Sequence, residues 1–225
     1  MSLLLQVNEG ANAGKATIEQ DISVLELVMK GGIIMIPIAI LSVLAIYIII
    51  ERLLYINKAG KINPQNMMML KDKLRSGNVK EAATFCRSTG TAWGRIFASG
   101  TSLVGQPMKD IQDRVEDSAT IEMSKMERNM TYLNLIAGVA PLLGFIGTIS
   151  GVIKIFHKIS ITADISIGNI SEGLYEKMIT SAAGLVVGII AFAGYHMLNS
   201  RIDRFASKIQ ENALSFKSTL QGVEE

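Results

Sequence analysis

The sequence predicts an all-α integral membrane protein with three transmembrane helices, two of which extend into a cytoplasmic helical bundle. Three long runs contain no charged residue, and each is long enough to cross roughly 30 Å of hydrocarbon as a helix. Apolar residues recur at three- and four-residue steps, which is the period of a helix, before the second of these runs and after the third. The charge-free runs are residues 31–50, 129–153 and 178–200.

The composition favours a membrane protein over other classes. The chain has 225 residues, of which 49% are hydrophobic and 19% charged, and its mean hydropathy is +0.34. A net charge of +2 is too small to indicate nucleic-acid binding. The sequence has no nucleophile–base pair, phosphate loop, redox motif or metal-ligand spacing, so we expect no enzyme activity, cofactor or metal site. We expect the single cysteine, Cys86, to be a buried structural thiol.

The basic residues are distributed unevenly and predict the orientation. Thirteen Lys and Arg lie within 51–128 and four follow residue 199, but only two precede residue 31. The positive-inside rule therefore places the long middle segment and the C-terminus in the cytoplasm, and the N-terminus on the outer side. The predicted division is an outer N-terminal segment with an amphipathic interfacial helix (1–30), three transmembrane helices (31–50, 129–156 and 171–200), a cytoplasmic helical region (51–128), a short outer linker (157–170) and a cytoplasmic tail helix (201–225).

Turn signals divide the cytoplasmic region into helices. Asn63-Pro64 predicts a helix start and Ser76-Gly77-Asn78 its end, and 79–87 then forms the second helix of a hairpin. A third helix of modest length is expected within 90–105, around Trp93.

Two long helices are expected to leave the membrane. An apolar stripe follows Pro107 at helical spacing. No Pro or Gly separates it from the second charge-free run, so we expect one continuous helix there. The third span should likewise continue into the tail. Both stripes suit either an intramolecular core or subunit packing. The stripes are Met108, Ile111, Val115, Ala119, Met123, Met126 and Met130, and then Ile202, Phe205, Ile209 and Leu214.

Glu176 stands at the head of the third charge-free run. Ile167, Ile170 and Leu174 indicate that the apolar face begins two or three turns earlier, which would place this carboxyl group inside the bilayer. An ionisable group there costs roughly 2.5 kcal/mol or more unless it faces water or a partner, so it is a functional-site hypothesis. The alternative is an interfacial pair of Glu176 with Lys177.

Small and hydroxyl-bearing residues recur in the second and third spans. Glycines four residues apart permit close approach of two helices, and a proline inside the second span predicts a bend. An antiparallel hairpin that turns near Asp164 places the hydroxyls in one layer, next to Glu176. Each hydroxyl could alternatively be structural, bonded to the carbonyl of the preceding turn. The packing residues are Pro141, Gly144, Gly147, Gly151, Gly184 and Gly188, and the hydroxyls are those of Thr148, Thr180 and Ser181.

These residues resemble a known family. The run from Ala140 to Gly151, the Gly-Leu-Tyr-Glu sequence ending at Glu176 and the Thr-Ser-Ala-Ala-Gly-Leu-Val sequence from Thr180 are similar to the ExbB, TolQ and MotA proton-channel family. The three-span layout, Glu51-Arg52 and the Gly-Asn-Val-Lys-Glu-Ala-Ala hairpin extend the resemblance from about Val24. The layout is closest to ExbB, with TolQ as the alternative.

The resemblance implies a homopentamer in a bacterial inner membrane, with the outer side facing the periplasm. Its pore would be lined by residues including Thr148, Glu176 and Ser181, although the family usually has Thr at the last position. It would hold the single spans of two copies of an ExbD- or TolR-like partner, each with an aspartate, and drive a TonB- or TolA-like protein by the proton motive force. Membrane lipid would surround the assembly.

The sequence is compatible with several other functions. A TolQ-like role in outer-membrane integrity differs from an ExbB-like role through the partner rather than this chain. A Na⁺-coupled stator or a passive channel could use the same pore. In a membrane scaffold, the small residues would only assemble helices, and Glu176 would be a surface residue.

Overall fold

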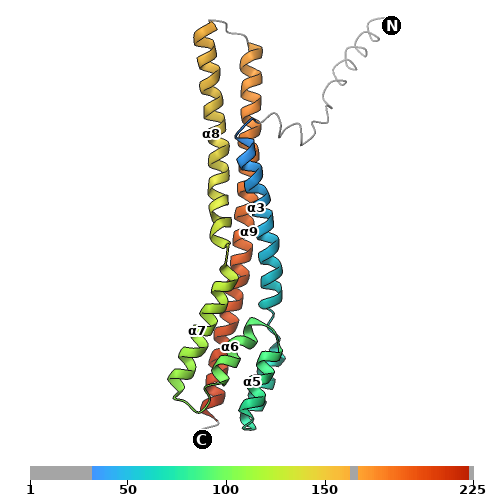
Figure 1. Cartoon of the computed structure of the whole chain (residues 1–225), viewed down its shortest axis with the longest axis vertical. Helices are drawn as coiled ribbons and strands as arrows, with labels where there is room; N and C mark the ends of the chain where they lie inside the picture. Colours follow the sequence, from blue (N-terminus) through green and yellow to red (C-terminus); the bar gives the residue numbers. More distant parts are fainter. Residues whose placement is uncertain (1–31, 163–166, 223–225) are drawn as a thin grey trace, which may run out of the picture.

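The computed structural model describes residues 32–162 and 167–222 and shows an elongated bundle of helices (Figure 1). The amphipathic helix predicted before residue 31 and the turn predicted near Asp164 lie outside the described residues. Three helices are long and apolar enough to cross a membrane, which confirms the all-α fold with three candidate spans. They are α3 (Met35–Ala59), α8 (Met130–Thr162) and α9 (Ile167–Gln221).

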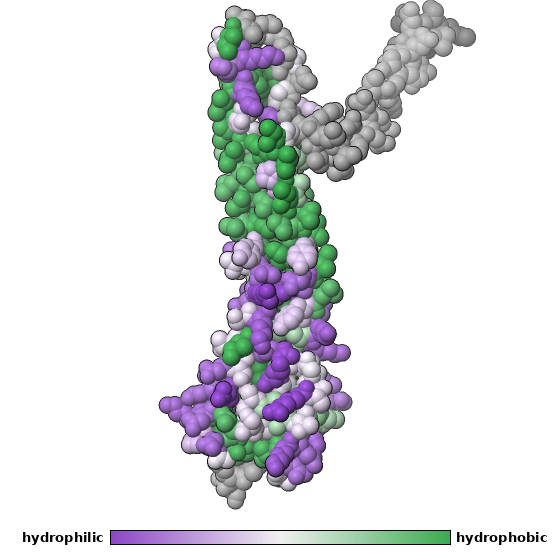
Figure 2. Space-filling model, in the orientation of Figure 1, coloured by the Kyte–Doolittle hydropathy of each residue, from purple (hydrophilic) through white to green (hydrophobic). Residues whose placement is uncertain are grey.

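Hydrophobic surface forms a band over these three helices. Figure 2 shows this band on the visible face, with polar residues both above and below it. On α3, only a narrow stripe is buried, while large apolar side chains such as Ile40, Val43 and Tyr47 are exposed on its other faces. A helix that exposes such residues is suited to lipid or to another membrane helix. We call the polar part below the band, residues 51–128 with α9 beyond residue 200, the charged end.

Local capping explains where the short helices of the charged end begin. Asn63 accepts a hydrogen bond from the Gln65 N–H at 3.1 Å, and Pro64 occupies the first turn of α4. Thr91 accepts one from the Gly94 N–H at 3.3 Å and begins α6. The three predicted short helices are confirmed as α4 (Pro64–Arg75), α5 (Val79–Ser88) and α6 (Ala92–Thr101).

The helix after Pro107 does not continue into the second span, so that prediction is wrong. α7 (Met108–Glu127) ends before α8 begins at Met130. Between them Arg128 is extended, with ψ 135°, and Asn129 is left-handed, with φ 65°. Asparagine tolerates this conformation better than most residues, so it can end a helix without a glycine or a proline.

α9 is a single helix of 55 residues, which confirms that the third span continues into the tail. Its buried side joins the core of the charged end through Phe216, whose ring lies 5.5 Å from that of Phe97. Phe97 in turn lies 5.0 Å from the ring of Trp93. Leu214, predicted in the buried stripe, is instead 71% exposed because the stripe passes from Ile209 to Phe216.

Candidate functional site

α8 and α9 run antiparallel and approach closely along the small residues of both helices (Figure 1). A Cβ placed on Gly144 would lie 3.0 Å from the Cα of Ser181, and one on Gly147 would lie 3.0 Å from the Thr180 methyl group. Gly184 faces Gly144 in turn, because its Cβ would lie 3.0 Å from the Gly144 Cα. A methyl group at any of these glycines would force neighbouring atoms to move, so the two backbones pack at short range.

The same register continues towards both ends of the helix pair. A Cβ on Gly188 would overlap the ring of Pro141 and lie 3.1 Å from the Ala137 carbonyl oxygen. At the other end, a Cβ on Gly151 would overlap the aliphatic chain of Lys177. All six predicted packing residues therefore lie in the contact between α8 and α9. The bend at Pro141 stays a prediction.

The three hydroxyl-bearing residues lie at one level of the helix pair. Gly147 contacts Thr180, and Thr148 and Ser181 are the next residues of the two helices. The Thr180 side chain is fully buried. The Thr148 hydroxyl donates to the Phe145 carbonyl of its own helix at 2.7 Å. This local bond satisfies the donor in an apolar setting, and the lone pairs of the same oxygen remain able to accept a hydrogen bond.

Glu176 lies in the helical backbone of α9, but its side chain lies outside the described residues. The helix begins at Ile167, so Glu176 is about two and a half turns inside it. Lys177 is the next residue, and its aliphatic chain covers Gly151. The carboxyl group is therefore carried by a helix that already packs on α8, rather than by a loop before it. Its role in a proton path stays a prediction.

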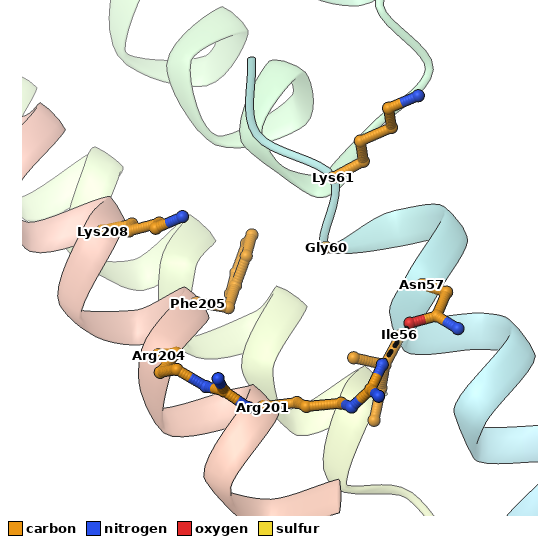
Figure 3. Close-up of a pocket in the computed structure, with 8 residues that line it drawn as sticks. All are labelled: Ile56, Asn57, Gly60, Lys61, Arg201, Arg204, Phe205 and Lys208. Carbon is orange, nitrogen blue, oxygen red and sulfur yellow. Dashed lines mark hydrogen bonds between the residues drawn. The ribbon is translucent and has the colours of Figure 1, made fainter. Parts of the chain in front are cut away.

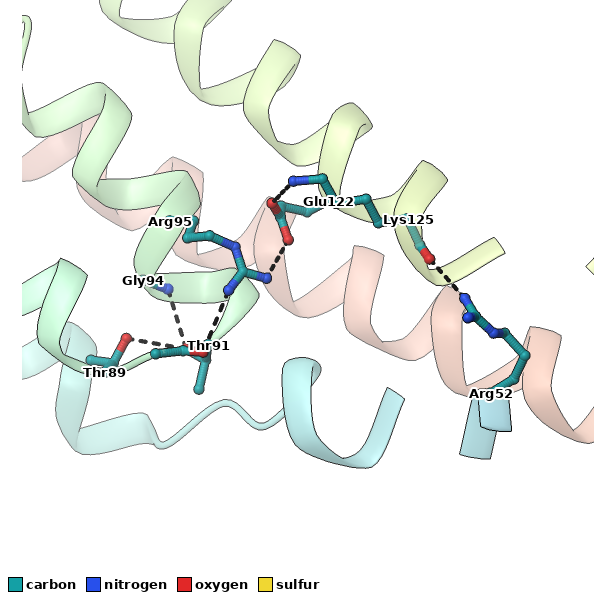
Figure 4. Close-up of polar contacts among 8 residues, drawn as sticks. Arg52, Thr89, Thr91, Gly94, Arg95, Glu122 and Lys125 are labelled. Atoms are coloured by element: carbon teal, nitrogen blue, oxygen red, sulfur yellow. Dashed lines mark hydrogen bonds and ion pairs between the residues drawn. The ribbon is translucent and has the colours of Figure 1, made fainter. Parts of the chain in front are cut away.

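A second polar cluster, at the charged end, was not foreseen from the sequence (Figure 4). Arg95 of α6 donates to Glu122 of α7 at 2.5 Å, and Lys125 donates to the other carboxylate oxygen at 2.7 Å. The Glu122 side chain is only 5% exposed. The sequence does contain a pattern that indicates this cluster. Glu122 lies between Ala119 and Met126 at helical spacing, so it falls on the buried face of α7.

Arg52 connects the end of α3 to the break between α7 and α8. Its guanidinium group is buried, pairs with Glu51 and donates to the Lys125 carbonyl oxygen at 3.0 Å. Asn129 donates to Glu51 at 3.5 Å. The hydrogen bond from Arg52 and its positive charge outweigh desolvation, so the pKa of Glu51 lies below its ordinary value. These contacts fix the angle at which α8 leaves the charged end.

Comparison with known proteins agrees with this layout. The profile of the MotA/TolQ/ExbB proton channel family matches residues 89–211. A putative biopolymer transport protein ExbB homolog of Methanothermobacter thermautotrophicus is 29% identical over 84% of this chain and 67% of its own length. The biopolymer transport protein exbB1 of Vibrio cholerae is 25% identical over 89% of this chain and 90% of its own. The Tol-Pal system protein TolQ of Haemophilus influenzae is 28% identical over 36% of each chain. Because the profile spans more than half of the chain, including α8, the hydroxyl level and most of α9, this protein belongs to the MotA/TolQ/ExbB proton channel family.

Proposed function

We propose that this protein is the pentameric inner-membrane stator subunit of a proton-driven motor that energises TonB-dependent outer-membrane transport, as ExbB does. The proposal is supported by family membership, by similarity to proteins named ExbB over most of the chain, and by the position of Glu176. That position carries most weight. Glu176 lies two to three turns inside a helix that packs on α8, so its carboxyl group is suited to a path between the spans.

In the proposed mechanism, α8 and α9 line a central pore that holds the single spans of two copies of an ExbD-like partner. A proton that crosses the membrane potential releases about 2.3 kcal/mol per 100 mV. The partner's aspartate carries the proton, and Glu176 with the hydroxyls of Thr148, Thr180 and Ser181 shapes its path. Neutralising a charge changes which position it prefers in an apolar pore, so protonation drives rotation of the pentamer about the partner. The motion is passed to a TonB-like protein, and no substrate is chemically altered.

The deciding experiment measures proton flux and partner-driven transport in vesicles that contain the protein and an ExbD-like partner. Glu176→Gln keeps the size of the side chain and removes its charge. Glu211→Gln is the matched control, because Glu211 is an exposed carboxylate on the same helix at the charged end. We expect Glu176→Gln to abolish both activities while the pentamer still assembles, and Glu211→Gln to retain both.

Other outcomes identify the competing functions. Full activity of Glu176→Gln would show that Glu176 is structural and would remove its support for the motor. A membrane scaffold would show no proton flux even in the native protein. Flux that disappears when Na⁺ is removed would indicate a Na⁺-coupled stator, and flux without any partner would indicate a passive channel. Complementation of a strain that lacks TolQ, but not of one that lacks ExbB, would assign the TolQ-like role in outer-membrane integrity.

A further inference from the structure

A basic pocket lies where α3 ends and α9 leaves the apolar band (Figure 3). It has a volume of about 370 Å³, with Ile56 and Phe205 as its apolar part. Its polar lining comes from two segments that are far apart in the sequence but adjacent in the fold. The polar and charged lining residues are Asn57, Lys61, Arg201, Arg204 and Lys208.

The pocket contains four cationic side chains and no carboxylate. None of the four forms a salt bridge with any part of the chain that the structure describes. Arg201 donates to the Asn57 side-chain oxygen at 2.6 Å, and the Arg204 Nε donates to the Ser200 carbonyl at 3.1 Å. These two bonds orient both guanidinium groups and leave other N–H groups available. Clustered like charges repel, so the arrangement favours an anion.

The pocket lies at the level expected for lipid headgroups. Arg201 is the first charged residue after the charge-free run 178–200. On α3, Ile50, Leu54 and Asn57 share one helix face, and the first two are 53% and 65% exposed apolar residues. On α9, the exposed Met197 lies one turn above Arg201. On both helices, exposed apolar surface therefore lies next to the four cations, on the membrane side of the pocket.

We propose that this pocket binds the phosphate group of an anionic glycerophospholipid, in the leaflet next to the charged end. The acyl chains would lie on the exposed faces of α3 and α9 above it. In the orientation predicted from the distribution of basic residues, this is the cytoplasmic leaflet, where basic pockets between transmembrane helices bind anionic headgroups. A lipid fits better than a free phosphate ion because the apolar surface beside the cations contributes to binding only when acyl chains are present. The bound lipid joins α3 to α9 at the membrane surface.

The test compares lipids that share acyl chains and differ in headgroup. Purified full-length protein is titrated with dioleoyl phosphatidylglycerol or dioleoyl phosphatidylcholine, and bound lipid is counted by native mass spectrometry. The pocket variant is Arg204→Gln/Lys208→Gln, since both side chains are exposed and their replacement spares the core. Two controls are matched to it. Lys109→Gln/Arg114→Gln removes the same charge from α7, and Lys58→Gln removes a cation near the end of α3 that does not line the pocket.

We expect phosphatidylglycerol to bind the native protein more tightly than phosphatidylcholine, and the pocket variant to lose on the order of tenfold in that preference. Both controls should retain it. Equal loss in a control, or no loss in the pocket variant, would overturn the proposal. Displacement of the lipid by excess inorganic phosphate would assign the pocket to a free anion instead. The readout does not involve proton flux, so failure of the proposed function would leave it unchanged.

Discussion

Glu122 is a buried carboxylate that holds α6 against α7 through two cations. Glu122→Gln retains the shape of the side chain but removes the charge that accepts from Arg95 and Lys125. Because hydrogen bonds to charged groups are the stronger ones, we expect the free energy of unfolding to fall by about 1–3 kcal/mol. Thermal unfolding in detergent, followed by the fluorescence of Trp93, measures this directly, since Trp93 is the single tryptophan and is fully buried in α6. Glu127→Gln, at an exposed position of α7, should leave the transition unchanged, and an equal effect of both variants would refute the assignment.

The same carboxylate predicts a dependence of stability on pH. Burial by itself raises the pKa of Glu122, but the hydrogen bonds from Arg95 and Lys125 and their charges outweigh this, so its pKa lies below the ordinary 4.5. The unfolded chain therefore binds this proton first as the pH falls. The stabilisation is complete above the ordinary pKa and is lost as the pH falls through the lower folded-state pKa. We expect the difference in unfolding midpoint between the native protein and Glu122→Gln to be constant near neutral pH and to shrink below about pH 4. A difference that grows on acidification would contradict this sign.

The junction of α7 and α8 depends on the left-handed conformation of Asn129. Asn129→Gly and Asn129→Ala both remove the amide group that contacts Glu51, but only glycine adopts this conformation without strain. We expect the alanine variant to be less stable than the glycine variant by about 1 kcal/mol, measured as unfolding midpoints in detergent. If alanine were the more stable of the two, α7 and α8 would form the continuous helix that the sequence predicts.

The contact of α8 with α9 has a matched pair of glycines for testing. A Cβ on Gly184 would lie 2.5 Å from the Ala140 carbonyl oxygen, which is backbone and cannot rotate away. A Cβ on Gly138 would meet nothing within 4 Å among the described residues. We expect Gly184→Ala to destabilise the protein by about 1–3 kcal/mol through overpacking, and Gly138→Ala to be tolerated. The unfolding midpoint and the oligomeric state in detergent measure the effect. An unchanged unfolding midpoint and oligomeric state of Gly184→Ala would show that α8 and α9 are farther apart at Gly184 than the structure places them.

At the scale of the whole molecule, the uneven charge predicts its orientation in the membrane. Burial raises the pKa of the Cys86 thiol to about 12, so the native cysteine is poorly reactive, and Cys86→Ala removes it altogether. In that background, Ser88→Cys places an exposed thiol at the charged end, and Ser160→Cys places one near the far end of α8. In intact bacterial cells, we expect an impermeant maleimide to label Ser160→Cys, and to label Ser88→Cys only after permeabilisation. The opposite pattern would reverse the orientation.

Local chemistry is sufficient to predict the spans and the short helices of this protein. The absence of charge over 20 or more residues marks each span, because no other fold accommodates such a run as well as a membrane helix does. Asn63 and Thr91 begin α4 and α6 with their own side chains, so neighbouring residues alone indicate these starts. The small residues of α8 and α9 also indicate from the sequence that two helices can approach closely there.

The sequence by itself determined the fold class and the three spans, since each follows from composition within one segment. The candidate pore residues follow from the resemblance to the family and stay a prediction. Only the tertiary structure decided which distant groups meet. Glu122 binds an arginine 27 residues away, and Arg201 contacts Asn57 across 144 residues. The left-handed Asn129 is likewise held where Arg52 and Glu51 of α3 reach the junction of α7 and α8. These contacts depend on how helices pack in three dimensions, and helical periodicity within a single segment carries no information about the partner on the next one.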